Sequence, residues 1–345
     1  MSAGTQIDGD RRAERLTRLI RHPFVRFLAR RLAAAVLTLW VVSVFIFVAT
    51  NVLPGNVAEV VLGHNATPAR IQALNVRMGY DHPMIERYFN WIEGVFNGDF
   101  GNSAVAVALS QPQTSVSSTL VQPLVDSLIL GSITAFLLVP LTLLLGALAG
   151  IYARRILDLA ISAPALVLGG LPEFVTGTLL IFVFFGVLDW LPPTSGFSPG
   201  QSPLTNVGRL VLPVLTLLGV ALGAGVRQVR VGMIETLHRD YVRFARLNGI
   251  PERRVLFRYA LRNALAPSVQ IIAQNIQYLF GGIIVVESIF DYPGIGQYIV
   301  NAVLARDTAK VEAAAIVIAA LYTLINIAAD FIVVLLVPKL RAPAA

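Results

Sequence analysis

The chain offers few residues of the kinds that catalyse reactions or bind metals. It has no cysteine, which excludes disulfides, thiolate metal sites and cysteine nucleophiles. Its two lysines, Lys310 and Lys339, do not follow a glycine, so the phosphate-binding loop of nucleotide hydrolases is absent. Its four histidines form no H-E-x-x-H pair, and a segment around Ser198 matches G-x-S-x-G without the strand-turn-helix that a nucleophile elbow needs. We therefore expect no catalytic residue and no metal site.

Polar side chains inside long apolar runs are better candidates for function. Glu173, Glu287 and Asp330 lie in or at the ends of such runs. A charge at the middle of a bilayer costs about 2.5–3.5 kcal/mol on insertion scales, so these side chains should face protein or water. Another run carries four amides on one broad side of a helix, namely Gln270, Gln274, Asn275 and Gln277. We predict that these residues line a translocation path; pairing at helix interfaces is the alternative.

The elements that must position these side chains are membrane spans. Only 14% of the 345 residues are charged, against about 25% in soluble domains, and the mean hydropathy is +0.71. Backbone groups in lipid must bond internally, so apolar runs that match a bilayer core of about 30 Å should be helices. We predict an all-α integral membrane protein with six transmembrane helices, at Leu32–Val52, Leu128–Ala153, Leu159–Leu188, Leu210–Val226, Ala264–Val286 and Ala313–Val337.

The basic residues predict the orientation of these spans. An even number of spans leaves both termini on one side of the membrane, and 21 of the 27 Lys and Arg residues fall on that side. The positive-inside rule therefore predicts that both termini are cytoplasmic. The net charge of +7 then reports orientation, and we expect no binding to nucleic acid. The first span is too long for a cleaved signal peptide.

This topology divides the chain into five regions. The first extracytoplasmic loop is the longest, and its Ser/Thr/Gln-rich part, residues 105–122, has the composition of a flexible insertion. The regions are a basic cytoplasmic tail (1–31), the first transmembrane helix (32–52), an extracytoplasmic loop region (53–126), a five-helix transmembrane core (127–337) that includes a cytoplasmic loop at 235–267, and a cytoplasmic tail (338–345).

The cytoplasmic loop at 235–267 is the most charged part of the chain, and its pattern is that of a helix, a glycine and a second helix. Gly249 can take positive φ and end the first helix, while Pro251 suits the first turn of the second. Pro267 then opens the fifth span. Val242 and Ala245 form an apolar ridge that we predict to dock in a groove of a partner. A loop that only fixes topology is the alternative.

This loop resembles the EAA loop of ATP-binding-cassette importer permeases, and more narrowly that of the peptide/nickel type. By that resemblance, Arg243-Phe244-Ala245 stand at the Glu-Ala-Ala triplet and Gly249 is the motif glycine. The chain departs from the general pattern at the first two triplet positions and lacks the closing Leu-Pro near Leu261. The Asp-Tyr-Val-Arg start and the late Pro267 match the peptide-type subgroup.

Four other segments resemble the same family in the expected order. Leu53-Pro54-Gly55 follows the first span, and the segments from Met78 to Pro83 and from Gly98 to Ser103 resemble the first outer loop. The stretch from Val285 to Gly296 resembles the end of the fifth span. The resemblance covers about residues 30 to 341.

The resemblance implies a type I importer permease in the bacterial inner membrane, with a long first extracytoplasmic loop. The expected partners are membrane lipid, a second homologous permease subunit, two cytoplasmic ATPase subunits and an extracytoplasmic solute-binding protein. This chain would bind no cofactor, and ATP and Mg²⁺ would be used by the ATPase subunits. The residues implied in coupling to the ATPase are Asp240, Tyr241, Val242, Arg243, Phe244, Ala245, Gly249 and Pro267.

The resemblance implies that the cargo is a di- or oligopeptide, with nickel complexes and sugars as alternatives. Two other classes of function remain open from the residues. A proton-coupled secondary transporter would use Glu173 or Asp330 as proton sites and need no ATPase. An intramembrane hydrolase would be built on Ser198.

Overall fold

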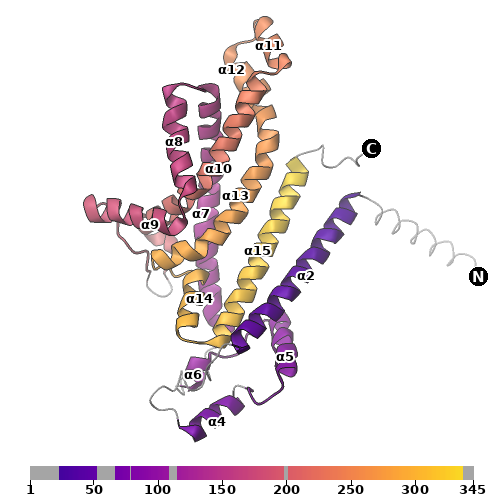
Figure 1. The fold of residues 1–345 in the computed structure, drawn as a ribbon, viewed down its shortest axis with the longest axis vertical. Coiled ribbons are helices and arrows are strands. Elements are labelled where there is room, and N and C mark those ends of the chain that lie inside the picture. Colours follow the sequence, from indigo (N-terminus) through magenta and orange to yellow (C-terminus); the bar gives the residue numbers. More distant parts are fainter. Residues whose placement is uncertain (1–22, 53–66, 78, 109–114, 198–200, 337–345) are drawn as a thin grey trace, which may run out of the picture.

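The structure, a computed structural model, describes residues 23–52, 67–77, 79–108, 115–197 and 201–336. Regular secondary structure over these ranges is helical, apart from one isolated bridge between Asn102 and Ser115. The all-α class is therefore confirmed. Figure 1 shows an elongated bundle in which α11 and α12 lie at one end and α4, α5 and α6 at the other.

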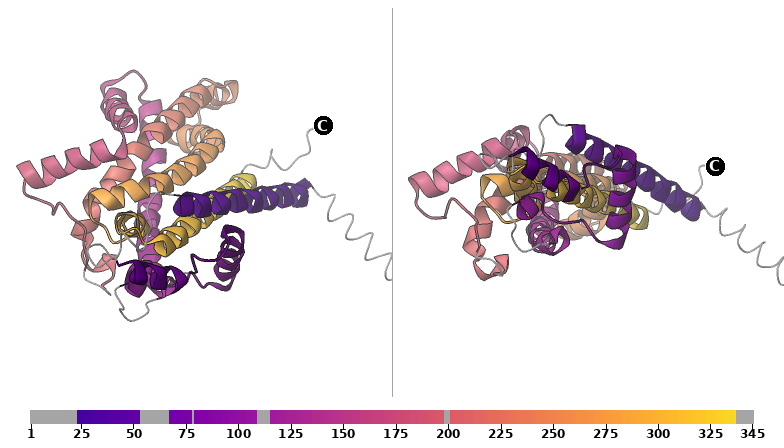
Figure 2. Two further views of the ribbon diagram at one scale, coloured as in Figure 1. Left: turned by 60° about the horizontal axis from the view of Figure 1, so that its bottom comes forward. Right: turned by 90° about the horizontal axis from the view of Figure 1, so that it is seen from below.

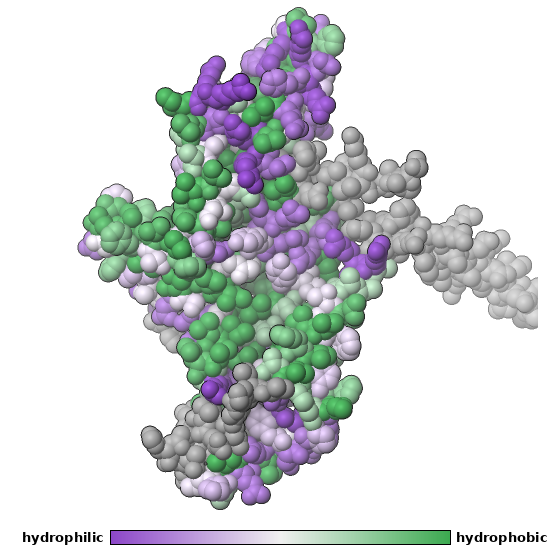
Figure 3. Space-filling model, in the orientation of Figure 1, coloured by the Kyte–Doolittle hydropathy of each residue, from purple (hydrophilic) through white to green (hydrophobic). Residues whose placement is uncertain are grey.

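Five helices are long and apolar enough to cross a membrane, and one bent pair adds a sixth candidate span. The long helices are α2 (Pro23–Val52), α7 (Val116–Ile151), α10 (Val211–Leu237), α13 (Arg262–Ile289) and α15 (Thr308–Leu336). Apolar side chains cover much of the middle of the face in Figure 3, and hydrophilic ones gather at both ends.

The predicted span Leu159–Leu188 is not one straight helix. It is divided into α8 (Ile156–Gly170) and α9 (Glu173–Ile181), and α9 continues as a π-helix over Phe182–Val187. The helix axis bends by 113° between the two parts. Leu171 and Pro172 between them are extended, with ψ of 139° and 151°. A proline disfavours helical geometry in the residue before it, which explains the break. In Figure 1, α9 projects sideways from the bundle.

The second span begins earlier than its hydropathy predicts. Helix α7 starts at Val116, inside the segment 105–122 that was expected to be a flexible insertion, and Pro123 is accommodated within it. Val116 and Leu120 are buried at 0% and 3% exposure, packed against residues of α14 (Ile295–Leu304) and α15. Tertiary burial, not local composition, therefore sets this helix boundary. The same segment also includes the short helix α6 (Ala104–Ala108).

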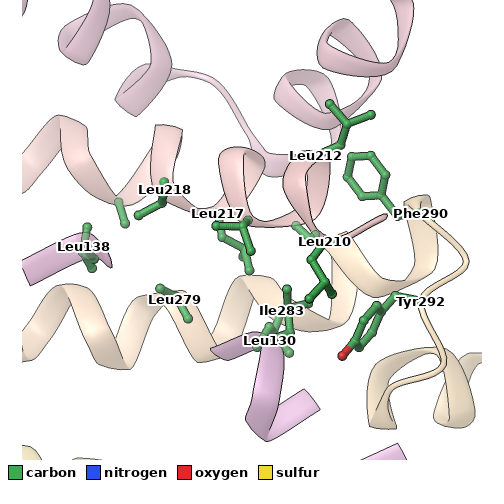
Figure 4. Packing of buried hydrophobic residues seen from close by; sticks show 13 residues of the cluster. Leu130, Leu138, Leu210, Leu212, Leu217, Leu218, Leu279, Ile283, Phe290 and Tyr292 are labelled. Carbon is green, nitrogen blue, oxygen red and sulfur yellow. The ribbon is translucent and has the colours of Figure 1, made fainter. Parts of the chain in front are cut away.

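Helix α10 is at the centre of the bundle and is packed by α7, α8 and α13. Its apolar side chains interdigitate with those of α7 and α13, as Figure 4 shows for Leu217, Leu130 and Ile283. Small residues allow the close approach, because a β-carbon at Gly150 of α7 would lie 2.6 Å from the β-carbon of Met233. The helices α2 and α15 pack together at one side of this core (Figure 2).

The remaining helices belong to the two ends of the molecule. At the end opposite α11 and α12 are α4 (Pro68–Arg77) and α5 (Met84–Asn97). Short 3-10 turns at Pro203–Thr205 and Val207–Leu210 precede α10. At the other end, α11 (Asp240–Leu247) and α12 (Glu252–Arg254) are followed by a π-helix over Val255–Leu261 that leads directly into α13.

Candidate functional site

A polar cavity of about 420 Å³ lies between α2, α13 and α15. It brings together three of the side chains predicted to line a path: Gln274 and Gln277 from α13, and Asp330 from α15. Its walls also contain Arg31, Ala34, Ala35, Thr38, Ala273, Tyr322, Thr323, Asn326, Ile327 and Val333.

Helical periodicity explains how the three helices build this cavity. Tyr322, Asn326 and Asp330 recur every four residues and so share one face of α15. Gln274 and Gln277 do the same on α13 at a spacing of three. Ala34, Ala35 and Thr38 of α2 and Ala273 of α13 are small, which leaves the volume open. The cavity therefore presents side-chain amides, which both donate and accept hydrogen bonds.

One ion pair lies at an edge of the cavity. A nitrogen of the Arg31 guanidinium lies 2.9 Å from an oxygen of the Asp330 carboxylate, and the Asp330 side chain is 25% exposed. The Asp330 charge is thus compensated by α2, and the pair joins the first and last candidate spans. Such a pair at an open edge can exchange partners with a charged group that enters the cavity.

The other predicted path residues lie elsewhere. Asn275 is buried between α13 and α10 and donates a hydrogen bond of 3.3 Å to the carbonyl of Ala221. Glu173 begins α9 and lies against Gly282 of α13, where a β-carbon would come within 2.8 Å of its carboxylate. The side chains of Gln270 and Pro267 lie outside the described residues, although both belong to α13, so Pro267 is inside that helix and does not open it.

Glu287 is enclosed by its own chain at 0% exposure, and it forms a joint between α7, α13 and α14. One carboxylate oxygen accepts a hydrogen bond from the Ser127 hydroxyl. The other accepts one of 2.7 Å from the backbone N–H of Gly296, at the start of α14. A carboxylate at a helix N-terminus is stabilised by the helix dipole and by the free N–H groups there.

The neighbouring residues complete this joint. The N–H of Ile295 donates to the Ser127 hydroxyl at 2.8 Å, and the Tyr292 hydroxyl donates to the carbonyl of Asp126 at 2.7 Å. Burial raises the pKa of Tyr292 above its usual value, so the hydroxyl stays protonated and can donate. A β-carbon at Gly294 would overlap the Glu287 carboxylate. The stretch from Val285 to Gly296 is thus a tightly packed corner.

A second joint between helices contains two acidic residues that the sequence analysis did not single out. Asp307 accepts hydrogen bonds from the Ser103 hydroxyl and from the N–H of Ala104, which starts α6. Glu312 accepts from Thr50 at 2.6 Å and from Asn51 at 3.2 Å, at the end of α2. The available signal was the position of both acidic residues directly before the last apolar run.

A smaller cavity of about 220 Å³ adjoins this second joint. Arg87 of α5 donates to the Asn51 side chain and lies over the ring of Tyr80, 4.4 Å from its centroid. The Tyr80 and Thr308 hydroxyls share a hydrogen bond of 2.8 Å. Burial raises the pKa of Tyr80 above its usual value. These contacts fix α5 to the end of α2 and the start of α15.

The loop at 235–267 has the predicted helix, glycine and helix. Gly249 has φ of +73° and follows α11, and Pro251 precedes α12. The ridge of Val242 and Ala245, however, was wrongly predicted to dock on a partner. These side chains are 0% and 5% exposed, packed against Val255. The turn at Gly249 folds the π-helix back onto α11 and covers them.

The uncovered side of α11 is a different apolar stripe. Tyr241, Phe244 and Leu247 recur every three residues and are 40%, 63% and 73% exposed. Basic residues flank them, Arg243 and Arg246 among them, and both of these are exposed. An exposed aromatic and aliphatic stripe with a basic rim has the composition of a protein-docking surface. The exposed apolar face of α11 thus lies one position away from the predicted ridge.

Comparison with known proteins identifies the class of molecule that carries these features. Residues 142–342, more than half of the chain, match the family "Binding-protein-dependent transport system inner membrane component". Residues 24–130 match the N-terminal family of the same transport systems. The chain belongs to this family of transport-system permeases.

Curated relatives cover nearly the whole permease. It is 30% identical to the glutathione transport system permease protein GsiC of Escherichia coli K12, over 92% of this chain and 99% of that protein. It is 29% identical to the probable D,D-dipeptide transport system permease protein DdpB of the same organism, over 92% and 98%. A probable peptide ABC transporter permease, y4tP of Sinorhizobium fredii, is 30% identical over 91% and 99%.

Family membership makes the chain a multi-pass membrane component of a transport system, with the type I importer permease fold. Ser198, in the G-x-S-x-G segment, lies outside the described residues. Within the described residues there is no cluster of three or more acidic, histidine or cysteine side chains that could hold a metal ion. These residues offer two candidate functional surfaces, the polar cavity and the exposed stripe of α11.

Proposed function

We propose that this permease forms the membrane path of an ATP-driven importer for di- or oligopeptides, and that the cavity between α2, α13 and α15 is part of that path. The observation that carries the proposal is the chemistry of the cavity. Its amides, Gln274, Gln277 and Asn326, can each donate and accept hydrogen bonds. A peptide backbone offers the same groups in every residue, so such a lining suits peptides of varied sequence.

The names of the relatives support this cargo class. Their printed substrates, which are glutathione, D,D-dipeptides and peptides, share amide bonds and charged termini. The ion pair of Arg31 with Asp330 adds one cation and one anion at the edge of the cavity. Peptide termini carry the same two charges, so they can interact with both members of the pair.

We propose that ATP drives this path through α11. Its stripe of Tyr241, Phe244 and Leu247 would dock in a groove of a cytoplasmic ATPase subunit, and the buried Val242 and Ala245 would transmit force to the π-helix that leads into α13. Because α13 carries Gln274 and Gln277, movement of α11 would change the shape of the cavity wall. The coupling is mechanical, and this chain needs no bound ATP.

The proposed assembly contains a second permease subunit, two ATPase subunits that use ATP and Mg²⁺, and an extracytoplasmic solute-binding protein. In this arrangement both termini face the cytoplasm of a bacterial cell, as the distribution of basic residues favours. The outer joints at Glu287 and Glu312 then lie at the extracytoplasmic ends of the spans.

The test is purification of the tagged chain from its native membrane in mild detergent, followed by reconstitution of the recovered complex. We expect an ATPase and a second six-span protein to co-purify, and labelled dipeptide to accumulate in liposomes only with ATP. A chain that purifies alone and moves solute under a proton gradient without ATP would contradict the proposal. Uptake of nickel complexes or sugars in preference to peptides would overturn the cargo assignment alone.

A further inference from the structure

Helix α5 in the first extracytoplasmic segment has an apolar surface that is only partly covered. Its inward side packs on α2, where the ring of Phe47 lies 5.4 Å from that of Tyr88 and 5.8 Å from that of Trp91. A second apolar stripe on α5 is 73%, 62% and 86% exposed in the described chain, at Ile85, Phe89 and Phe96. This stripe therefore needs an occupant that the described chain does not supply.

The depth of α5 identifies the surroundings of this stripe. The Tyr88 hydroxyl shares a hydrogen bond of 2.9 Å with that of Ser43 in α2. Ser43 is eight residues before Asn51, where the candidate span ends, which is about 12 Å deeper along a helix. Phe47 is about 6 Å deeper than Asn51 by the same rise. Helix α5 thus lies beside the outermost turns of α2 and not beyond them, as Figure 1 also shows.

The face of α2 under α5 continues as an uncovered apolar stripe. Val36, Trp40, Ser43 and Phe47 follow one another on one side of the helix at spacings of four, three and four. Val36 and Trp40 are 67% and 58% exposed, whereas Ser43 and Phe47 are 1% and 3% exposed. Helix α5 therefore covers only the outer part of a surface whose inner part remains open at the depth of the bilayer core. The open surface of α2 continues directly into that of α5.

The sequence of α5 is that of an interfacial helix. The stripe residues Ile85, Phe89 and Phe96 recur with Ile92 on one side, and the exposed polar residues Glu86, Asn90 and Asn97 lie on an adjacent side of the helix. Aromatic side chains are enriched where membranes meet water. Helices that lie in this layer bury their apolar face roughly 5–10 Å deep, the depth at which Phe47 places α5.

We propose that the stripe of Ile85, Phe89 and Phe96 is embedded in the outer leaflet of the membrane, so that lipid is the occupant of the uncovered face of α5. Helix α5 is joined to α2 by Arg87 and Asn51, and Asn51 in turn donates to Glu312 of α15. The lipid anchor thus holds the outer ends of the two helices that form one wall of the polar cavity. This inference needs only a membrane-spanning chain and is independent of the cargo.

The absence of native cysteine makes a direct test available. Full-length variants with Phe89→Cys or Phe96→Cys are labelled at that cysteine with a polarity-sensitive fluorophore. The labelled proteins are then reconstituted in phosphatidylcholine vesicles. Asn90→Cys, on the exposed polar side of the same helix, is the matched control. Because interfacial helices bury their apolar face in acyl chains, we expect brominated acyl chains to quench labels at 89 and 96 about threefold more strongly than the label at 90. Aqueous iodide should show the reverse order.

Two results would overturn the proposal. In the first, labels at 89 and 90 respond equally to iodide and to brominated lipid. In the second, the label at 89 is shielded from both quenchers in the co-purified complex, or becomes so when the solute-binding protein is added, which would make a protein the occupant. Gel-filtration elution of each variant, compared with the parent chain, verifies that the labelled protein is folded.

Discussion

Glu287 and Asp330 are both acidic residues of long apolar helices, yet their surroundings differ. Glu287 is completely buried, and each of its carboxylate oxygens accepts a hydrogen bond from the same chain. Asp330 is 25% exposed and lies on the wall of an open cavity, with Arg31 as its counter-ion. An acidic residue in a span thus indicates a path only where its surroundings are open, because the same carboxylate elsewhere holds helix ends together.

The largest difference between the two residues is expected when the Glu287 carboxylate is removed. We expect Glu287→Ala to leave the N–H of Gly296 and the Ser127 hydroxyl without an acceptor, at about 1–3 kcal/mol for each buried group. The Tm in detergent should fall by several degrees, and less folded protein should be recovered. Asp330→Ala is the matched control and should lower the Tm less. Equal losses in the two variants would contradict the distinction drawn here.

The next largest effect concerns the two faces of α11. Phe244→Asp places a charge on the exposed stripe, so ATP-driven uptake should fall at least about tenfold, equivalent to about 1.4 kcal/mol of coupling, while the Tm stays unchanged. Ala245→Asp buries a charge against Val255 and should lower both uptake and Tm. Uptake assays on both proteins, matched for membrane content, separate the two outcomes. Normal uptake by Phe244→Asp would remove α11 from the coupling path.

A smaller effect is expected at the cavity ion pair. Asp330→Asn keeps the shape of the side chain and removes its charge, so peptide uptake should change by a few-fold. Because the pair is partly exposed, stability should fall by no more than about 1 kcal/mol. Initial uptake rates for a free dipeptide and its N-acetylated form would report whether the charge interacts with a peptide terminus. Identical rates for parent and variant with both substrates would place Asp330 outside the path.

The smallest effect is expected beside the second joint, where Tyr80 contacts Thr308. Tyr80→Phe removes the hydroxyl that shares a hydrogen bond with Thr308, and a typical loss is about 1 kcal/mol. Uptake should stay close to that of the parent, because the rings around Arg87 remain. Thermal unfolding in detergent measures the change. A large loss of uptake without a loss of stability would show that this joint does more than hold α5.

Hydropathy located the spans because lipid exposure demands long apolar runs, but it could not place their ends. Helix α7 gains its first turns from packing of Val116 and Leu120 against α14 and α15, which no local pattern encodes. The break at Leu171 and Pro172 was hidden inside a long apolar run whose one charged residue is Glu173. Its proline was a usable signal.

The site was predicted in part for similar reasons. Periodicity showed that Val242 and Ala245 share a face of α11, but it could not show that Val255 of the same chain covers them. Spacing put the four amides of α13 on one broad side, yet packing places Gln274 and Gln277 on the cavity and Asn275 against Ala221. The role of Glu287 depends on contacts with Ser127, which is 160 residues away in sequence.

The most direct test of the path is the accessibility of single cysteines at Gln277 and Asn275 in the complete complex. Because this chain has no native cysteine, modification of this subunit by a membrane-impermeant thiol reagent, read on its separated gel band, reports the introduced residue alone. We predict that Gln277→Cys is modified, that transported peptide slows this reaction severalfold, and that ATP changes its rate, while Asn275→Cys stays unreactive throughout. Equal reactivity of the two cysteines, or a Gln277→Cys rate that neither peptide nor ATP alters, would contradict the account.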